Sequence, residues 1–133
     1  AKISEYQITS GSGESAEMLD RVRADGILAA APAGTPGYGT AAGGPLLDPN
    51  LEAVTVIPVG PFRVEQPHWV LELPVSLRVV REEVPVSLLV DDREVGSLEA
   101  GTAVDLSWGR PLTVLRTPVS RSALAGSPAT AEE

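Results

Sequence analysis

The sequence predicts an all-β domain, mainly an antiparallel two-sheet sandwich with one or two short helices. Three observations predict it. The 133 residues suit a single domain, and they include 13 Gly and 12 Pro, which disfavour a helical bundle. Aromatic residues make up only 4%, so the core must be aliphatic. Short Val- and Leu-rich segments recur about every ten residues in the second half, as in sandwiches and barrels.

The first half of the predicted fold contains three strands. Residues 1–10 and 18–23 alternate in part between apolar and polar side chains, and the Gly- and Ser-rich residues 11–17 predict a turn between them. Asp25-Gly26 is typical of a turn or of a close backbone approach. It is followed by a short apolar run, Ile27 to Ala31, which predicts a buried strand.

The second half is expected to add six strands. These segments are four to six residues long and end at Pro, Gly or charged turns: Ala53–Ile57, Val70–Leu73, Ser76–Val80, Val86–Val90, Val104–Trp108 and Leu112–Arg116. Residues 91–94 and 99–102 are predicted hairpin tips, and Asp48-Pro49-Asn50 is a predicted turn. We expect one folded domain over residues 1–118 and a disordered tail over 119–133, which is rich in Ser, Ala and Pro.

Composition excludes several functional classes. There is no Cys and only one His, His68, so disulfide frameworks, zinc fingers and His-rich metal sites are excluded. The net charge of −8 opposes binding to nucleic acids and anionic membranes, and no apolar run is long enough for a transmembrane helix. The acidic excess, with a single Lys among the basic residues, favours a GC-rich or salt-loving source.

The segment from Asp25 to Pro49 is the strongest candidate for a binding site. A predicted buried strand leads into the Gly- and Pro-rich residues 32–39, where glycine lets a ligand approach backbone N–H groups and proline limits the entropy lost on binding. Thr35, Tyr38 and Asp25 offer hydrogen-bonding groups. The alternative is a plain surface loop before a short helix at Thr40–Ala42. Neither the P-loop pattern nor GxGxxG occurs in this segment.

This segment resembles the C-terminal domain of the NAD kinases, the ATP- or polyphosphate-dependent enzymes that make NADP. Their signature has D-G, four mostly apolar residues, T-P-T-G-S-T-A-Y, a short helix, A-G-G-P and then H/D-P. Here Asp25-Gly26 matches the D-G, and residues 31–38 match the eight-residue segment T-P-T-G-S-T-A-Y, called the octet below. Residues 42–45 match the A-G-G-P, and Asp48-Pro49 matches the final H/D-P. Residues 56–61 resemble the family's L-T-P-I-C-P, and Asp91 matches the Asp of a later D-G turn.

The resemblance implies a role for five residues in binding NAD. The octet binds the dinucleotide in the family, and the Asp of D-G reaches its nicotinamide end. The resemblance assigns these roles to the residues at the matching positions of this sequence, which are Asp25, Gly34, Thr35, Gly37 and Tyr38. NAD would be the substrate, with ATP or polyphosphate as phosphoryl donor and a divalent metal such as Mg²⁺ in the full-length enzyme. The resemblance also implies a cytoplasmic homo-oligomer, a dimer or a tetramer.

The octet departs from the family pattern at five positions, and at one of them Thr35 replaces Ser with its hydroxyl intact. The two Thr on either side of the octet's Pro are replaced by Ala31 and Ala33. The third Thr is replaced by Pro36, and the octet's Ala is replaced by Gly37. Each missing hydroxyl contact is worth about 0.5–1.5 kcal/mol, so the lost contacts would weaken NAD binding by roughly one to three decades. The alternative reading is therefore a diverged, non-catalytic β domain that senses a ligand or binds a partner. A third is a plain β-sandwich interaction module.

The family's catalytic motifs do not occur in this sequence. The G-G-D-G-T motif, whose Asp serves phosphoryl transfer, and an Asn-Glu pair belong to an N-terminal α/β domain of the family. We expect this chain to be a segment of a longer protein, with no catalytic residue and no metal ligand of its own, and to be inactive alone.

Other chemical groups have simpler explanations. His68 is a candidate general base, but a lone His beside a Pro at the start of a strand is more often structural or exposed. The pairs Glu82-Glu83 and Asp91-Asp92 are candidates for acid–base or metal chemistry, but adjacent acids in turns usually face water. Trp69 and Trp108 are expected at the core edge or an interface.

Overall fold

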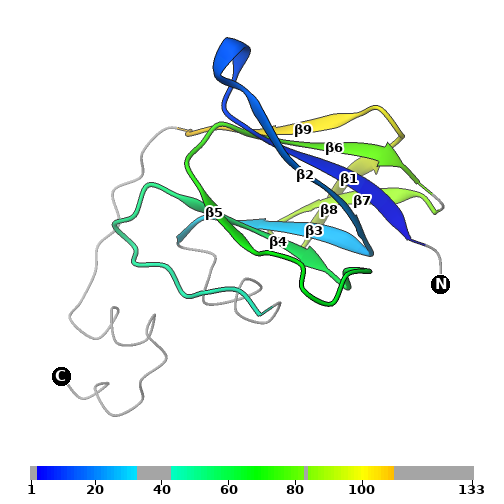
Figure 1. Ribbon diagram of the computed structural model, residues 1–133, viewed down its shortest axis with the longest axis horizontal. Helices are drawn as coiled ribbons and strands as arrows, with labels where there is room; N and C mark the ends of the chain where they lie inside the picture. Colours follow the sequence, from blue (N-terminus) through cyan, green and yellow to red (C-terminus); the bar gives the residue numbers. More distant parts are fainter. Residues whose placement is uncertain (1–2, 33–42, 83, 110–133) are drawn as a thin grey trace.

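Nine strands and one 3-10 turn make up the regular structure that the computed structural model describes, which covers residues 3–32, 43–82 and 84–109 (Figure 1). The strands are β1 (Ser4–Ser10), β2 (Glu17–Ala24), β3 (Gly26–Ala30), β4 (Val54–Val59), β5 (Trp69–Leu71), β6 (Val75–Arg81), β7 (Val86–Val90), β8 (Arg93–Leu98) and β9 (Ala103–Leu106), with the 3-10 turn η1 at Gly13–Ser15. The all-β prediction is confirmed.

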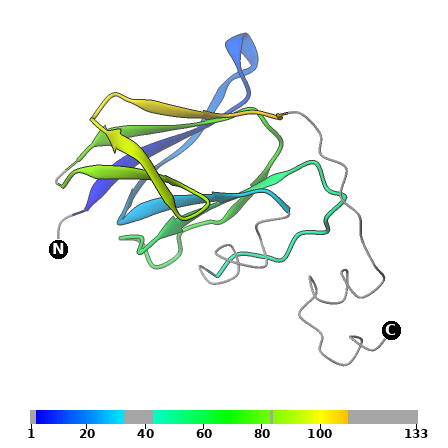
Figure 2. The same cartoon turned by 180° about the vertical axis from the view of Figure 1, so that it is seen from behind.

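The strands form two layers and a separate hairpin. One sheet has the order β2-β1-β6-β9 and the other β3-β4-β5, and every pairing is antiparallel. Among the strands that the structure describes, β7 and β8 pair with each other and with no third strand. Figure 2 shows this hairpin lying across the side of the molecule between the two sheets.

The core lies between the two sheets and is aliphatic, as predicted. Its fully enclosed side chains come from both layers: Ile8, Val22, Ala24, Val54, Val56 and Val75. In β1 the residues alternate between buried and half-buried from Ser4 to Ile8, which places Tyr6 and Ile8 on the core face. Burial of such branched side chains supplies the main driving force for joining the layers.

The chain changes sheet at Asp25. Strand β2 pairs with β1 in the four-stranded sheet, whereas β3 begins one residue later and pairs with β4 in the other sheet. The Asp25-Gly26 signal therefore marks a crossover between layers, and the strands on either side of it do not pair as a hairpin. This crossover sets the position of the candidate site.

Two sequence-based expectations need correction. Residues 99–102 do form a turn, with the Thr102 N–H donating to the Glu99 carbonyl at 3.0 Å, but β8 and β9 lie in different sheets, so the turn is no hairpin tip. Strand β8 itself was not among the predicted strands. The tip at 91–94 is confirmed, and Asp91 and Asp92 there have positive φ angles of 49° and 67°.

The predicted helix at Thr40–Ala42, the strand at Leu112–Arg116 and the tail at 119–133 lie outside the described residues. The 3-10 turn η1 instead occupies part of the predicted loop 11–17. Residues 48–51 turn as predicted, with the Leu51 N–H donating to the Asp48 carbonyl at 3.0 Å. In the part of the chain that is described, no helix is both long and apolar enough to cross a membrane.

Candidate functional site

Asp25 is held at the crossover by both of its backbone polar groups. Its N–H donates a hydrogen bond of 2.9 Å to the carbonyl of Val59, the last residue of β4. Its carbonyl accepts a longer hydrogen bond, 3.4 Å, from the hydroxyl of Tyr6 on β1. Asp25 is thus tied to both sheets, and its side chain projects from a fixed backbone.

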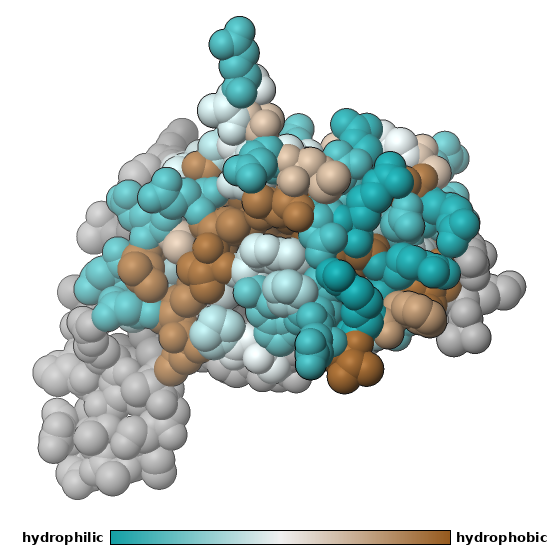
Figure 3. All heavy atoms as spheres, viewed as in Figure 1, coloured by the Kyte–Doolittle hydropathy of each residue, from teal (hydrophilic) through white to brown (hydrophobic). Residues whose placement is uncertain are grey.

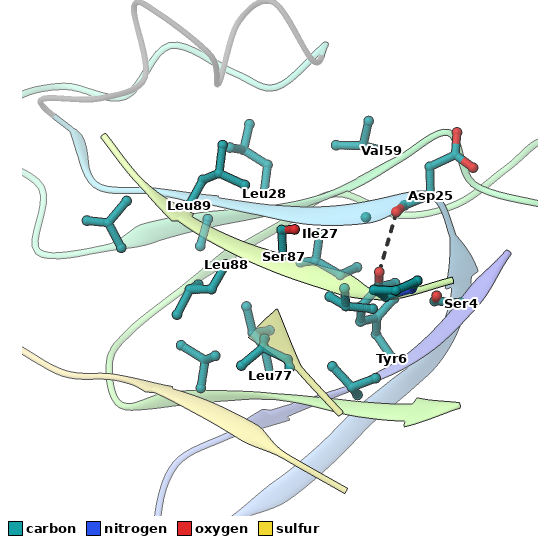
Figure 4. Close-up of a pocket in the computed structure, with 18 of the residues that line it drawn as sticks. Ser4, Tyr6, Asp25, Ile27, Leu28, Val59, Leu77, Ser87, Leu88 and Leu89 are labelled. Carbon is teal, nitrogen blue, oxygen red and sulfur yellow. Dashed lines mark hydrogen bonds between the residues drawn. The ribbon is translucent and has the colours of Figure 1, made fainter. Parts of the chain in front are cut away.

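The carboxylate of Asp25 lies over Gly60, the residue after β4. A Cβ built on Gly60 would come within 2.9 Å of Asp25 Cγ and closer still to Asp25 Oδ2. Gly60 also has a φ of +59°, which favours glycine. Figure 4 shows the carboxylate on the side of the Asp25 backbone that faces away from Tyr6.

Tyr6 provides a buried hydroxyl at the same corner. The residue is only 5% exposed. Burial raises the pKa of the Tyr6 phenol above its ordinary value, the negative charge of Asp25 raises it further, and a hydrogen bond with Ser4 opposes them. The phenol therefore stays protonated at neutral pH and acts as a hydrogen-bond donor.

A cavity of about 700 Å³ opens beside this corner, between the sheets and the β7–β8 hairpin (Figure 4). Its walls are mainly aliphatic, with Ile27, Leu28, Leu77 and Leu88 among them. Polar groups come from Ser4, Tyr6, Asp25, Ser87 and Asp91. A volume of this size with few polar groups is typical of small-molecule sites. The arrangement suits a ligand with one apolar part and one hydrogen-bonding end.

Strand β3 connects the Asp25 corner to the predicted binding loop. At about 3.3 Å per residue, its five residues place Gly26 and Ala30 roughly 13 Å apart. The far end is fixed by the buried Thr55, whose hydroxyl donates to the Ala30 carbonyl at 3.2 Å. Of the five predicted site residues, the structure places Asp25. Gly34, Thr35, Gly37 and Tyr38 lie outside the described residues, so their roles stay predictions.

Comparison with known proteins identifies the family. The family described as the ATP-NAD kinase C-terminal domain matches residues 9–110. The chain belongs to this family. It is 33% identical over 92 residues to the NAD kinase of Methanosarcina barkeri, covering 66% of this chain and 32% of that protein. It is 37% identical over 93 residues to the NAD kinase of Nitratidesulfovibrio vulgaris, covering 68% and 31%.

Two crystal structures resemble this NAD kinase C-terminal domain in fold. An NAD kinase from Archaeoglobus fulgidus in complex with ATP aligns with a TM-score of 0.69 and 26% identity, over 95% of this chain and 48% of that one. Yeast NADH kinase complexed with NADH aligns with a TM-score of 0.64 and 25% identity, over 75% and 29%. This domain spans about a third of the length of the NAD kinases from M. barkeri and N. vulgaris.

The other candidate groups of this domain lie apart from the Asp25 corner, except that Asp91 lines the same cavity. His68 is exposed next to β5, and a Cβ built on Gly43 would lie 3.7 Å from its Cε1. Asp91 and Asp92 are exposed at the β7–β8 tip, in agreement with a solvated turn, and Glu83 is not described. Trp69 packs against the core, whereas Trp108 is 53% exposed. Within residues 3–32, 43–82 and 84–109, no group of three acidic or His side chains is arranged to hold a metal ion.

Sequence reasoning missed two residues of this corner. Tyr6 was assigned only to the apolar alternation of the first strand, and its hydroxyl was not considered. Gly60 was noted only within the match to L-T-P-I-C-P, where it replaces the family's Cys. That replacement is the one available signal, because Asp25 and Gly60 are 35 positions apart in the sequence and only the fold brings them into contact.

Proposed function

We propose that this domain binds the dinucleotide, and forms the oligomer contacts, in an NAD kinase that transfers a phosphoryl group from ATP or polyphosphate to the 2′-hydroxyl of NAD. The observation that carries the proposal is the family match over residues 9–110, with the Asp of D-G placed at a rigid corner between two sheets. The relatives described in complex with ATP and with NADH support a nucleotide ligand.

Each site residue has a role in this proposal. The Asp25 carboxylate accepts a hydrogen bond from the amide or hydroxyl groups at the nicotinamide end of NAD, and its backbone contacts hold it ready. Thr35 donates or accepts through its hydroxyl, the Gly34 and Gly37 backbones allow close approach, and Tyr38 stacks or donates through its phenol. These residues bind and orient the dinucleotide.

The phosphoryl transfer itself is assigned to residues outside this sequence. Such a transfer requires a positioned nucleophile and neutralisation of phosphate charge by a metal and basic groups. The G-G-D-G-T motif is absent from the 133 residues. The proposal therefore assigns the catalytic Asp and the Mg²⁺–phosphate site to an N-terminal domain of the whole protein, and it predicts that this chain alone makes no NADP.

A second function is supported by the octet substitutions. Ala31, Ala33 and Pro36 remove three hydroxyl groups that the family uses for the dinucleotide. A diverged domain that senses another ligand or binds a partner would keep the fold without NAD affinity. An intact G-G-D-G-T motif encoded upstream would favour the kinase over this alternative.

Calorimetric titration of NAD and NADP into the purified chain tests the proposal. We expect binding that Asp25→Asn and Tyr38→Ala each weaken about tenfold or more, since a hydrogen bond to a charged group is worth roughly 1.5–3 kcal/mol. Asp105→Asn is the matched control, because this acidic residue is exposed on β9 and does not line the cavity. Absence of binding by the folded wild-type chain would favour the diverged domain.

A coupled assay for NADP tests the assignment of catalysis. The chain is incubated with NAD, Mg²⁺ and either ATP or polyphosphate, and NADP is detected with an NADP-specific dehydrogenase. We expect no product from the chain alone. Any product that disappears with Asp25→Asn would contradict the assignment of catalysis to another domain.

A further inference from the structure

We propose that Gly60 is a positioning residue, which sets the direction of the Asp25 carboxylate by leaving space for it. The inference rests on the proposed function in one respect, namely that Asp25 binds the dinucleotide. The predicted site does not include Gly60.

Because hydrogen bonds hold the backbone of Asp25 in place, the direction of its carboxylate depends only on the side-chain torsion angles. Its N–H is bonded to Val59 and its carbonyl to Tyr6, so its Cα and Cβ are anchored to β4 and β1. Within the described residues the carboxylate itself accepts no hydrogen bond and makes no ion pair. Contact with the bare backbone at Gly60 is therefore what restrains the carboxylate, and its oxygens remain available to a ligand.

Any side chain at position 60 would compete with the carboxylate for this space. A Cβ there would lie 3.3 Å from Asp25 Cβ and 2.9 Å from Cγ, with Oδ2 nearer still. Heavy atoms essentially never approach so closely, so Asp25 would have to rotate about its Cα–Cβ bond.

Strain at Gly60 must be separated from its contact with Asp25. The φ of Gly60 is +59°, and any other residue there is strained for that reason alone. Gly13 provides a matched control, because its φ is +58° and a Cβ built on it meets nothing within 4 Å. Gly13→Ala therefore carries the same backbone penalty without touching Asp25.

Nuclear magnetic resonance on the purified chain tests the positioning directly, without any ligand. The Hα–Hβ couplings of Asp25 report its side-chain rotamer. We expect Gly60→Ala to change the Asp25 couplings to values typical of a different rotamer or of several averaged rotamers. Gly13→Ala should leave the Asp25 couplings at their wild-type values. Unchanged couplings in Gly60→Ala would overturn the proposal.

NAD titration then tests the consequence for binding through a double-mutant cycle. We expect Gly60→Ala to weaken NAD binding about tenfold when Asp25 is present. In the Asp25→Ala background we expect Gly60→Ala to have no further effect on NAD binding. An equal loss in both backgrounds would show that Gly60 acts independently of Asp25 and would overturn the proposal. If the wild type binds no NAD, the proposed function fails, while the Asp25 couplings still decide the role of Gly60.

Folding of the variants provides a separate check. If Gly60→Ala alone does not fold, the contact with Asp25 predicts that Asp25→Ala/Gly60→Ala does, since removal of the carboxylate relieves the clash. Failure of the double variant, beside a folded Gly13→Ala, would show that position 60 requires glycine for other reasons and would overturn the proposal.

Discussion

Tyr6 connects the core to the Asp25 corner through a single hydroxyl. Tyr6→Phe retains the buried ring and removes the hydroxyl, which interacts with Ser4 and donates a 3.4 Å hydrogen bond to the Asp25 carbonyl. Such a long bond contributes little, so we expect a loss of about 0.5 kcal/mol in the free energy of unfolding at neutral pH. Urea denaturation of the two proteins at pH 7 measures this difference.

The same substitution changes the dependence of stability on alkaline pH. The pKa of Tyr6 is raised in the folded chain, mainly by burial. The unfolded chain therefore loses the proton first, and stability falls as the pH rises above about 10, the ordinary pKa of tyrosine. We expect Tyr6→Phe to reduce this fall between pH 9 and pH 11. An identical fall in both proteins would contradict the raised pKa.

Single residues of the site were predictable only where a local motif marks them. Asp25 belongs to an Asp-Gly pair that is conspicuous in the sequence, and the structure places Asp25 at a rigid corner. Gly60 acquires its contact with Asp25 only through the β3–β4 pairing, in which Gly26 lies opposite Val59 and the next residues, Asp25 and Gly60, meet. Side-chain alternation placed Tyr6 in a strand, but it cannot show which distant carbonyl its hydroxyl reaches.

The β3–β4 pair determines where the predicted binding loop leaves the sheet. Thr55 is fully buried on β4, opposite Ala30 at the end of β3, and its hydroxyl donates to the Ala30 carbonyl. Thr55→Val keeps the shape and removes the donor. We expect a loss of about 0.5–1.5 kcal/mol in the free energy of unfolding, measured by chemical denaturation.

Thr9→Val on β1 is the control for this substitution. Thr9 is half-buried, and its hydroxyl makes no hydrogen bond to any described residue. We expect Thr9→Val to change the stability by less than Thr55→Val does. Equal changes in the two variants would mean that the Thr55 hydroxyl gives no stabilising contact.

Among the elements, buried strands were predicted better than exposed ones. Strand β4 is buried from Val54 to Pro58 and is apolar there except for Thr55, and this pattern predicted it. Strand β8 is exposed from Arg93 to Ser97, so no apolar alternation indicates it. The partition into sheets was not predictable either, because the turn at 99–102 has the residues of a hairpin yet joins strands of different sheets.

Apolar side chains also remain on the surface of the molecule. Figure 3 shows them gathered across the region of β5, on the face seen in Figure 1, with hydrophilic side chains around them. Val70 on β5 is 50% exposed, and Phe62 is 64% exposed beneath the guanidinium of Arg23, whose carbon lies 5.0 Å from the ring centre. Exposed apolar residues on this scale agree with the proposed oligomer contacts. Sedimentation velocity of the chain measures the oligomeric state.

The charge of the whole molecule leads to a last prediction, a dependence of stability on salt. The 18 acidic side chains exceed the 10 basic ones, and two of the ion pairs between described residues are Arg63–Asp20 at 2.6 Å and Arg21–Glu5 at 3.9 Å. Repulsion among the acidic groups therefore opposes the compact state. The screening length falls from about 10 Å in 0.1 M salt to about 3 Å in 1 M. We expect a higher melting temperature in 1 M KCl than in 0.1 M KCl.

A charge-reduced variant separates screening from other effects of salt. Asp91→Asn/Glu94→Gln removes two negative charges from the exposed hairpin, and Asn tolerates the positive φ of position 91 at least as well as Asp does. If repulsion is the cause, the variant melts at a higher temperature than the wild type in 0.1 M KCl and gains less from 1 M KCl. Equal gains in the two proteins would assign the salt effect to hydration of the apolar surface, and no gain in either would remove acidic repulsion as a determinant of this fold's stability.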